Sequence, residues 1–151
     1  MNETIAGAPR AAAPWHLWAV GLISLLWNCY GAYEYAMSHI GGREFILGRG
    51  FDEAAVTWFE AMPPWATACW AIGVWVSLVG SILLLARSRH AATAFLVSLV
   101  GAAASFAYQF TSDRPASIEG FGNTVIPVVI LIAIVLQWYY ARRMTAAGVL
   151  R

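Results

Sequence analysis

Residues 63–112 decide the fold and read PPWATACWAIGVWVSLVGSILLLARSRHAATAFLVSLVGAAASFAYQFTS. Two runs without a charged residue, 63–86 and 91–112, flank the turn Arg87-Ser88-Arg89-His90. A helix that crosses a bilayer needs about 20 mostly apolar residues, and each run is long enough. Because the turn is short, we expect the two helices to lie antiparallel and side by side.

Two further apolar runs extend this pattern to the whole chain. Residues 14–33 hold no charge, nor do residues 120–141. The sequence therefore predicts one all-α membrane domain over 1–151, an antiparallel bundle of four transmembrane helices. Its predicted parts are a tail (1–13), a first span (14–37), an outer loop (38–62), a second span (63–86), a turn (87–90), a third span (91–112), an outer loop (113–119), a fourth span (120–141) and a tail (142–151).

The composition agrees with a membrane protein. The 151 residues are 60% hydrophobic and 11% charged, whereas an ordinary globular chain is about 25% charged. The formal net charge is only +1, and no basic cluster indicates a nucleic-acid partner. The spans leave too little chain for a soluble catalytic domain, so we expect no enzyme activity, and membrane lipids are the first expected partners.

The charges predict the orientation. The two tails and the turn hold six arginines and one acid: Arg10, Arg87, Arg89, Arg142, Arg143 and Arg151, with Glu3. The other side holds three arginines and seven acids: Arg43, Arg49 and Arg114, with Glu34, Glu44, Asp52, Glu53, Glu60, Asp113 and Glu119. Because arginines near span ends mark the cytoplasmic side, both termini are expected inside.

The first outer loop contains a second helical signal. Acids Asp52 and Glu53 precede an apolar face of Val56, Phe59 and Met62, and prolines follow. This pattern predicts a short amphipathic helix over 52–62. We expect it to lie on the membrane surface, with Trp58 and Phe59 pointing inward.

Small residues predict how the spans pack, since close approach of helices drives association in lipid. The second and third spans each carry small residues at intervals of three or four positions, so these two faces are expected to meet. The residues expected in this contact are Gly73, Ser77, Gly80, Ala94, Ser98 and Ala102. Pro127 removes one backbone amide hydrogen from the fourth span and predicts a kink there.

Polar and aromatic residues fall at similar depths in the outer half of the spans. Because buried polar groups in a membrane usually face the bundle interior, we expect one outward-facing pocket. An aromatic ring can stack on the apolar face of a hydroxylated solute while amide and carboxylate oxygens bind its hydroxyls. The candidate solute-binding residues are Asn28, Tyr30, Glu34, Trp70, Tyr108 and Gln109.

Other roles for the same residues remain open. Asn28 and Gln109 can serve as hydrogen bonds between helices, and Glu34 can be a helix end exposed to water. Glu34 can also be a proton-coupling carboxylate, although four-helix exporters place that glutamate deeper in the first helix. If it does couple transport to protons, Glu34→Gln should change substrate-dependent proton movement in liposomes.

The sequence predicts no metal, cofactor or redox centre. Cys29 and Cys69 fall at comparable depths, so a disulfide is conceivable, but buried free thiols are the expectation because no Cys-x-x-Cys motif is present. His16, His39 and His90 belong to different segment ends and predict no metal site.

The chain resembles a group of small bacterial inner-membrane proteins of uncharacterised function. The matching stretches are Pro14-Trp15-His16-Leu17-Trp18, Leu26-Trp27-Asn28, Gly31-Ala32-Tyr33-Glu34-Tyr35, Ala71-Ile72-Gly73-Val74-Trp75, Gly80-Ser81, Leu83-Leu84-Leu85, Arg87-Ser88-Arg89, Tyr108-Gln109 and Trp138-Tyr139-Tyr140-Ala141-Arg142-Arg143. The resemblance covers nearly the whole chain and implies four helices in the inner membrane. Its members often carry the automatic label "sugar transporter".

Two functions from different classes follow. The first is a carrier for a small, sugar-like solute, which at this size is expected to act as a homodimer or larger oligomer. The second is a noncatalytic accessory or assembly subunit that docks on a larger membrane complex. Saturable sugar binding favours the first, and a stable co-purifying partner favours the second.

Overall fold

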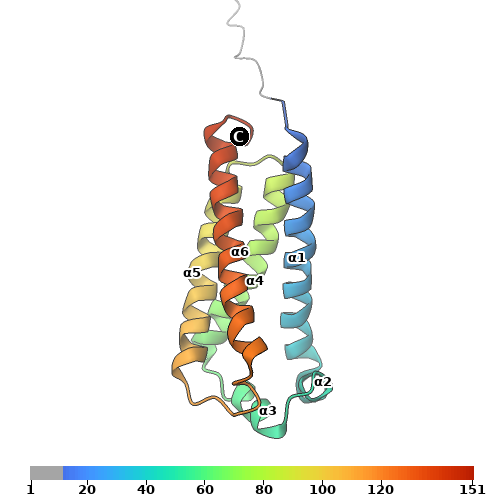
Figure 1. The fold of residues 1–151 in the computed structure, drawn as a ribbon, viewed down its shortest axis with the longest axis vertical. Helices are drawn as coiled ribbons and strands as arrows, with labels where there is room; N and C mark the ends of the chain where they lie inside the picture. Colours follow the sequence, from blue (N-terminus) through green and yellow to red (C-terminus); the bar gives the residue numbers. More distant parts are fainter. Residues whose placement is uncertain (1–11) are drawn as a thin grey trace, which may run out of the picture.

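The computed structural model describes residues 12–151, which contain helices and no strands, as predicted for the fold class (Figure 1). The helices are α1 (Trp15–Ile40), α2 (Gly42–Gly48), α3 (Glu53–Glu60), α4 (Pro64–Leu85), α5 (His90–Thr111) and α6 (Phe121–Ala146). The long helices α1, α4, α5 and α6 form an antiparallel bundle, and α2 and α3 lie at one end of it. Residues 1–11 of the predicted first tail, with Glu3 and Arg10, lie outside the described range.

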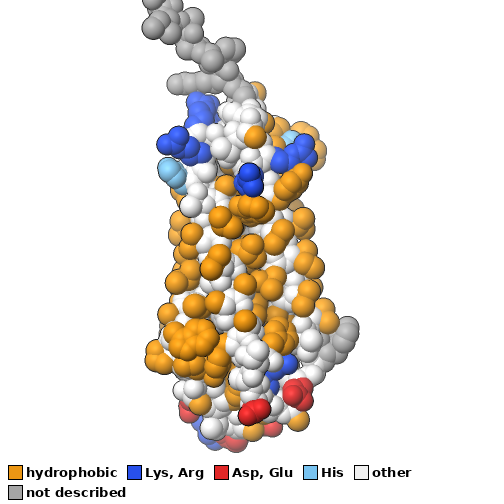
Figure 2. All heavy atoms as spheres, turned by 90° about the vertical axis from the view of Figure 1, so that its left-hand side faces the viewer, with side chains coloured by type: hydrophobic (Ala, Val, Ile, Leu, Met, Phe, Trp, Pro, Cys, Tyr) orange, Lys and Arg blue, Asp and Glu red, His pale blue; other side chains and the backbone are white. Residues whose placement is uncertain are grey.

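Three of the described helices, not four, are long and apolar enough to cross a membrane: α4, α5 and α6. The prediction of four apolar spans was therefore wrong for α1. That helix has 26 residues, which is sufficient length, but Trp15, His16, Trp18, Trp27 and Asn28 make it less apolar. On the face shown in Figure 2, hydrophobic side chains form a broad band, with arginines at one end and acids together with further arginines at the other.

Several predicted boundaries differ from the structure. The first helix continues to Ile40 instead of ending at 37, and α6 continues to Ala146 instead of 141. The first outer loop contains α2 as well as the predicted helix, which is shorter than expected at Glu53–Glu60. Pro127 lies inside α6, which continues as one helix over Phe121–Ala146.

The small-residue faces of α4 and α5 meet. A Cβ at Gly73 would lie 3.0 Å from the Ala102 nitrogen, and the Ser98 hydroxyl donates a 2.6 Å hydrogen bond to the Gly73 carbonyl. Gly80 instead packs beneath the Phe95 ring, which a Cβ would approach to 2.9 Å. All six predicted packing residues are buried: Gly73, Ser77, Gly80, Ala94, Ser98 and Ala102.

The end of the bundle near the C-terminus is closed by an apolar core. Leu17 of α1, Leu84 of α4 and Phe95 of α5 are each fully buried there. Leu150, from the segment expected to be a tail, packs in the same cluster. The Arg151 amide donates to the Arg87 carbonyl, and the Arg89 amide donates to the Arg151 carbonyl, each at 2.8 Å. The C-terminus therefore seals this end.

The opposite end is covered by α3. The Asp52 carboxylate caps α3 by accepting a 2.9 Å hydrogen bond from the Ala55 amide, and it also accepts a 2.7 Å bond from the Ser117 hydroxyl. The Ser117 hydroxyl and the Ala55 amide together lower the pKa of Asp52, because both stabilise the charged form. Ala55 and Val56 are buried against protein. The helix thus covers the bundle end rather than presenting its apolar face to lipid.

Candidate functional site

A cavity of about 350 Å³ lies between the long helices in the half of the bundle nearest α2 and α3. Five of the six candidate residues line it: Asn28, Tyr30, Glu34, Trp70 and Gln109. Its volume falls within the range of about 300–1,000 Å³ that is usual for small-molecule sites. The remaining walls are mainly apolar, with Ile126, Ile130 and Ile134 contributed by α6.

The cavity is bounded on one side by α1 and α6, which are not extensively packed against each other. Packing is extensive between α1 and α4, between α4 and α5, and between α5 and α6. Helices α1 and α6 are joined at the closed end by His16 Nδ1 and the Tyr140 hydroxyl, 2.6 Å apart. Farther along, Asn28 Nδ2 lies 3.3 Å from Gln137 Oε1. Beyond this contact, toward α2 and α3, residues of both helices line the cavity.

Asn28 forms the floor of the cavity and links three helices. Its Nδ2 donates to the Ser81 hydroxyl at 2.8 Å, and lies 3.2 Å from the Ser77 carbonyl and 3.3 Å from Gln137 Oε1. An amide group has two hydrogens, so the two longer contacts share one of them. The side chain is 5% exposed. Asn28 therefore lines the cavity and also supplies the interhelical hydrogen bonding considered from the sequence.

Glu34 is held by an arginine that the sequence analysis did not select. Arg49, which follows α2, places Nη2 2.8 Å from Glu34 Oε1 and 3.1 Å from the Tyr30 hydroxyl. The Glu34 contact is an ion pair without hydrogen-bond alignment, since Oε1 makes no hydrogen bond within the described residues. The Tyr30 hydroxyl and then the Glu34 carboxylate raise the pKa of Arg49 above its ordinary value, because both favour the cation.

The side chains of Gln109 and Tyr108 point to different places, although the two residues are neighbours in the sequence. Gln109 lines the cavity, and its amide donates a 3.3 Å hydrogen bond to the Ser105 hydroxyl. Tyr108 does not line it; its ring stacks on Trp58 at 6.4 Å and meets the edge of Trp65 at 5.5 Å. Tyr108 was therefore wrongly assigned to the pocket and instead packs against the cover formed by α3.

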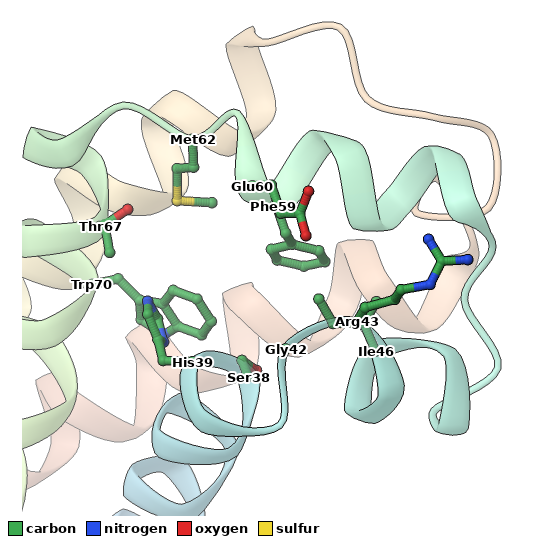
Figure 3. A pocket seen from close by; sticks show the side chains of 10 residues that line it. All are labelled: Ser38, His39, Gly42, Arg43, Ile46, Phe59, Glu60, Met62, Thr67 and Trp70. Atoms are coloured by element: carbon green, nitrogen blue, oxygen red, sulfur yellow. The ribbon is translucent and has the colours of Figure 1, made fainter.

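Trp70 stands in the wall between this cavity and a second one. The second cavity, also about 350 Å³, lies between the ends of α1 and α4 and the short helices (Figure 3). Trp70 and Phe59 border both cavities, with ring centroids 6.4 Å apart. Tyr35 packs edge-on against Trp70 at 5.0 Å. Phe59, which was expected to dip into the membrane surface, instead packs against Trp70 within the protein.

Two further polar residues at the cavity were not predicted. Arg114, in the loop after α5, and Asn123, in the first turn of α6, both line it. The Arg114 guanidinium carbon lies 4.7 Å from the centre of the Phe110 ring. Loop arginines give no periodic signal, so the sequence offers only their location on the outer side.

The remaining reactive side chains do not form a site in the described part of the chain. Cys29 and Cys69 are both free thiols; Cys29 is exposed, contrary to the expectation that both would be buried. Among residues 12–151, no three His, Cys, Asp or Glu side chains are grouped as metal ligands. No protein-family model, curated protein or solved structure matches the chain.

Proposed function

We propose that the chain crosses a bacterial inner membrane four times, with both termini in the cytoplasm and α2 and α3 outside. The three apolar helices and the hydrophobic band in Figure 2 support a membrane location. α1 lies antiparallel beside α4 and has the length of a span, which supports a fourth pass. Arginine enrichment at the closed end supports the orientation, because arginines near span ends favour the cytoplasmic side.

We further propose that the protein is a carrier for a small hydroxylated, sugar-like solute. The observation that carries this proposal is that five of the six polar and aromatic residues expected at similar depths line one cavity. Tyr30 and Trp70 offer aromatic rings for the C–H face of the solute, while Glu34 and Gln109 offer hydrogen bonds to hydroxyls. The closed end blocks passage to the cytoplasm, so transport requires that this end opens; a small bundle favours an oligomer for this step.

A binding measurement tests the proposal at Gln109. We expect purified full-length protein to bind at least one member of a panel of radiolabelled hexoses and pentoses saturably. Gln109→Leu should weaken that binding about tenfold, because it removes hydrogen bonds between the protein and the solute. Gln109 is preferred to Asn28 for this test, since within residues 12–151 its side chain makes only the long hydrogen bond to Ser105 of the same helix.

Thr111→Ala is the matched control. Thr111 is exposed on the same helix, and its hydroxyl donates to the Ala107 and Tyr108 carbonyls of α5. Its removal should leave solute binding unchanged. The carrier proposal is contradicted if the wild-type protein binds no labelled sugar, or if Gln109→Leu binds as well as wild type. A stable co-purifying membrane partner, together with absent sugar binding, would favour the accessory subunit instead.

A further inference from the structure

The cavity concentrates positive charge on a side of the molecule that is otherwise acidic. Outside the closed end, the chain holds three arginines and seven acids. Two of those arginines, Arg49 and Arg114, line the cavity, but only one of the acids, Glu34, does so. Two positive charges and one negative charge leave the lining at +1. The local charge therefore has the opposite sign to that of its surroundings.

Arg114 supplies the unneutralised charge. Arg49 and Glu34 compensate each other at 2.8 Å. Arg114, by contrast, makes no ion pair with any of residues 12–151, and its recorded contact is the Phe110 ring. A guanidinium group presents a planar set of donors that matches a phosphate or carboxylate. The mouth of the cavity therefore favours an anionic ligand group.

Below this mouth the α6 wall becomes apolar. Asn123 lines the outer end, and Ile126, Ile130 and Ile134 follow on successive turns toward the closed end. Ile126 is 55% exposed, whereas Ile134 is 3% exposed. Sugar hydroxyls buried against this isoleucine wall would be left without hydrogen bonds, so a sugar-like group fits only the polar half of the cavity. An alkyl chain does fit the isoleucine wall.

The cavity is charged at one end and apolar at the other, in the same order as the headgroups and acyl chains of a lipid leaflet. Arg49 and Arg114 lie at the end where the headgroups would be, and the isoleucines extend toward the membrane centre. Because α1 and α6 pack little against each other beyond Asn28, their shared side offers an entry for a molecule that is already in the bilayer. Trp27 and Tyr30 are 43% and 55% exposed along this side.

We propose that the ligand of this cavity is a phosphate-bearing amphiphile with a hydroxylated head. Its phosphate binds Arg114, its hydroxyls bind Gln109 and Glu34, and its chain lies between α1 and α6 along the isoleucine wall. This inference rests on the proposed solute site and specifies its substrate class. It also removes the need for a polar route through the closed end, since such a ligand reaches the cavity from the lipid.

Four defined probes distinguish the contributions of head and chain. Purified full-length protein in non-ionic detergent is titrated with dioctanoyl phosphatidylglycerol, the head alone (glycerophosphoglycerol), dioctanoylglycerol, and dioctanoyl phosphatidylcholine, and binding is measured by native mass spectrometry. We expect phosphatidylglycerol to bind more tightly than glycerophosphoglycerol by on the order of a hundredfold, because the chain adds apolar burial. It should also bind more tightly than the zwitterionic and uncharged lipids.

Two variants test the phosphate and chain positions separately. Arg114→Gln should weaken phosphatidylglycerol about tenfold by removing a charged hydrogen-bond donor, and should leave dioctanoylglycerol unchanged. Gly31 lies on the same face of α1 as Asn28 and Glu34, with nothing within 4 Å of where a Cβ would be. Gly31→Leu should therefore obstruct the three chain-bearing probes without disturbing the fold.

Gly48→Leu is the control for Gly31→Leu, since a Cβ at Gly48 also meets open space but Gly48 does not line the cavity. The inference is overturned if the free head binds as tightly as the whole lipid, if phosphatidylcholine binds equally well, or if Arg114→Gln has no effect. Saturable binding of free sugars that phosphatidylglycerol does not displace would leave the carrier proposal standing and remove this one. Absence of binding by every sugar and every lipid probe would remove both.

Discussion

Gly101→Val is expected to destabilise the bundle more than any other single change considered for this chain. A Cβ at Gly101 would lie 2.8 Å from the Cys69 carbonyl oxygen and 3.0 Å from the Gly73 nitrogen. Both are backbone atoms of α4, so they cannot move aside as a flexible side chain can. Overpacking of this kind costs about 3 kcal/mol. In lipid or detergent, close helix approach is the main source of association, which makes the loss severe.

The measurement is the SDS fraction at which tryptophan fluorescence reports unfolding from mixed micelles. Gly101→Val should unfold at a clearly lower SDS fraction than wild type. Ala103→Val is the matched control, because Ala103 is exposed on the same helix and gains the same methyl groups. Its effect should stay within about 0.5 kcal/mol. Equal midpoints for Gly101→Val and wild type would show that α4 and α5 are not in backbone contact at this position.

Asn28→Leu is expected to cause the second-largest loss of stability. The substitution keeps roughly the same volume but removes the donor that joins α1 to Ser77 and Ser81 of α4 and to Gln137 of α6. Hydrogen bonds between membrane helices contribute modestly, so we expect a loss of about 1.5 kcal/mol. Part of this loss comes from Gln137, which is 7% exposed and loses its partner.

A double variant separates the stability loss caused by the unpaired Gln137 amide from the loss caused by removing the other Asn28 hydrogen bonds. In Asn28→Leu with Gln137→Leu, both members of the α1–α6 hydrogen bond are apolar, so the penalty for an unpaired buried amide disappears. The double variant should therefore be more stable than the sum of the two single changes predicts. Cys29→Leu, at an exposed neighbouring position, serves as the control. An Asn28→Leu protein as stable as wild type would contradict the structural role assigned to this side chain.

The α4–α5 hairpin was predictable because two properties of the sequence agree on it. The charge-free runs give the helix lengths. Because the Arg87–His90 turn is short, the two helices must be neighbours. The small residues then identify the contact face, since they repeat at the helical period. Gly101 was not among the predicted contacts, although its backbone approach to α4 is among the closest, because it lies one position from the chosen stripe.

The sequence predicted the depth of the candidate site residues along the helices, but not the direction in which each side chain points. Counting residues along a helix gives the height of Tyr108 and Gln109, which is nearly the same. Successive residues on a helix, however, point about 100° apart, so only one of the two can face a narrow cavity. The helical period could have excluded Tyr108. Arg49 and Arg114 could not have been assigned to the cavity, because nothing in the sequence determines how a loop returns over a bundle.

The first helix illustrates a limit of predicting membrane spans from hydropathy. Its length agrees with a span, but tryptophan, tyrosine, histidine and asparagine lower its hydropathy relative to α4, α5 and α6. The same residues are the ones that form the cavity rim and the α1–α6 contacts at Asn28 and His16. Such polar residues lower the hydropathy by which a membrane-spanning helix is predicted.

The most direct test of the proposed membrane topology is whether α1 crosses the membrane. In a background with Cys29→Ser and Cys69→Ser, single cysteines are placed at three exposed positions by Ala12→Cys, His90→Cys and Ala116→Cys. Cells with a permeabilised outer membrane are treated with a membrane-impermeant maleimide. We expect Ala116→Cys to react at once, and Ala12→Cys and His90→Cys to react only after the inner membrane is opened. Labelling of Ala12→Cys as rapid as that of Ala116→Cys would show that α1 does not cross the membrane and would contradict the proposed four passes.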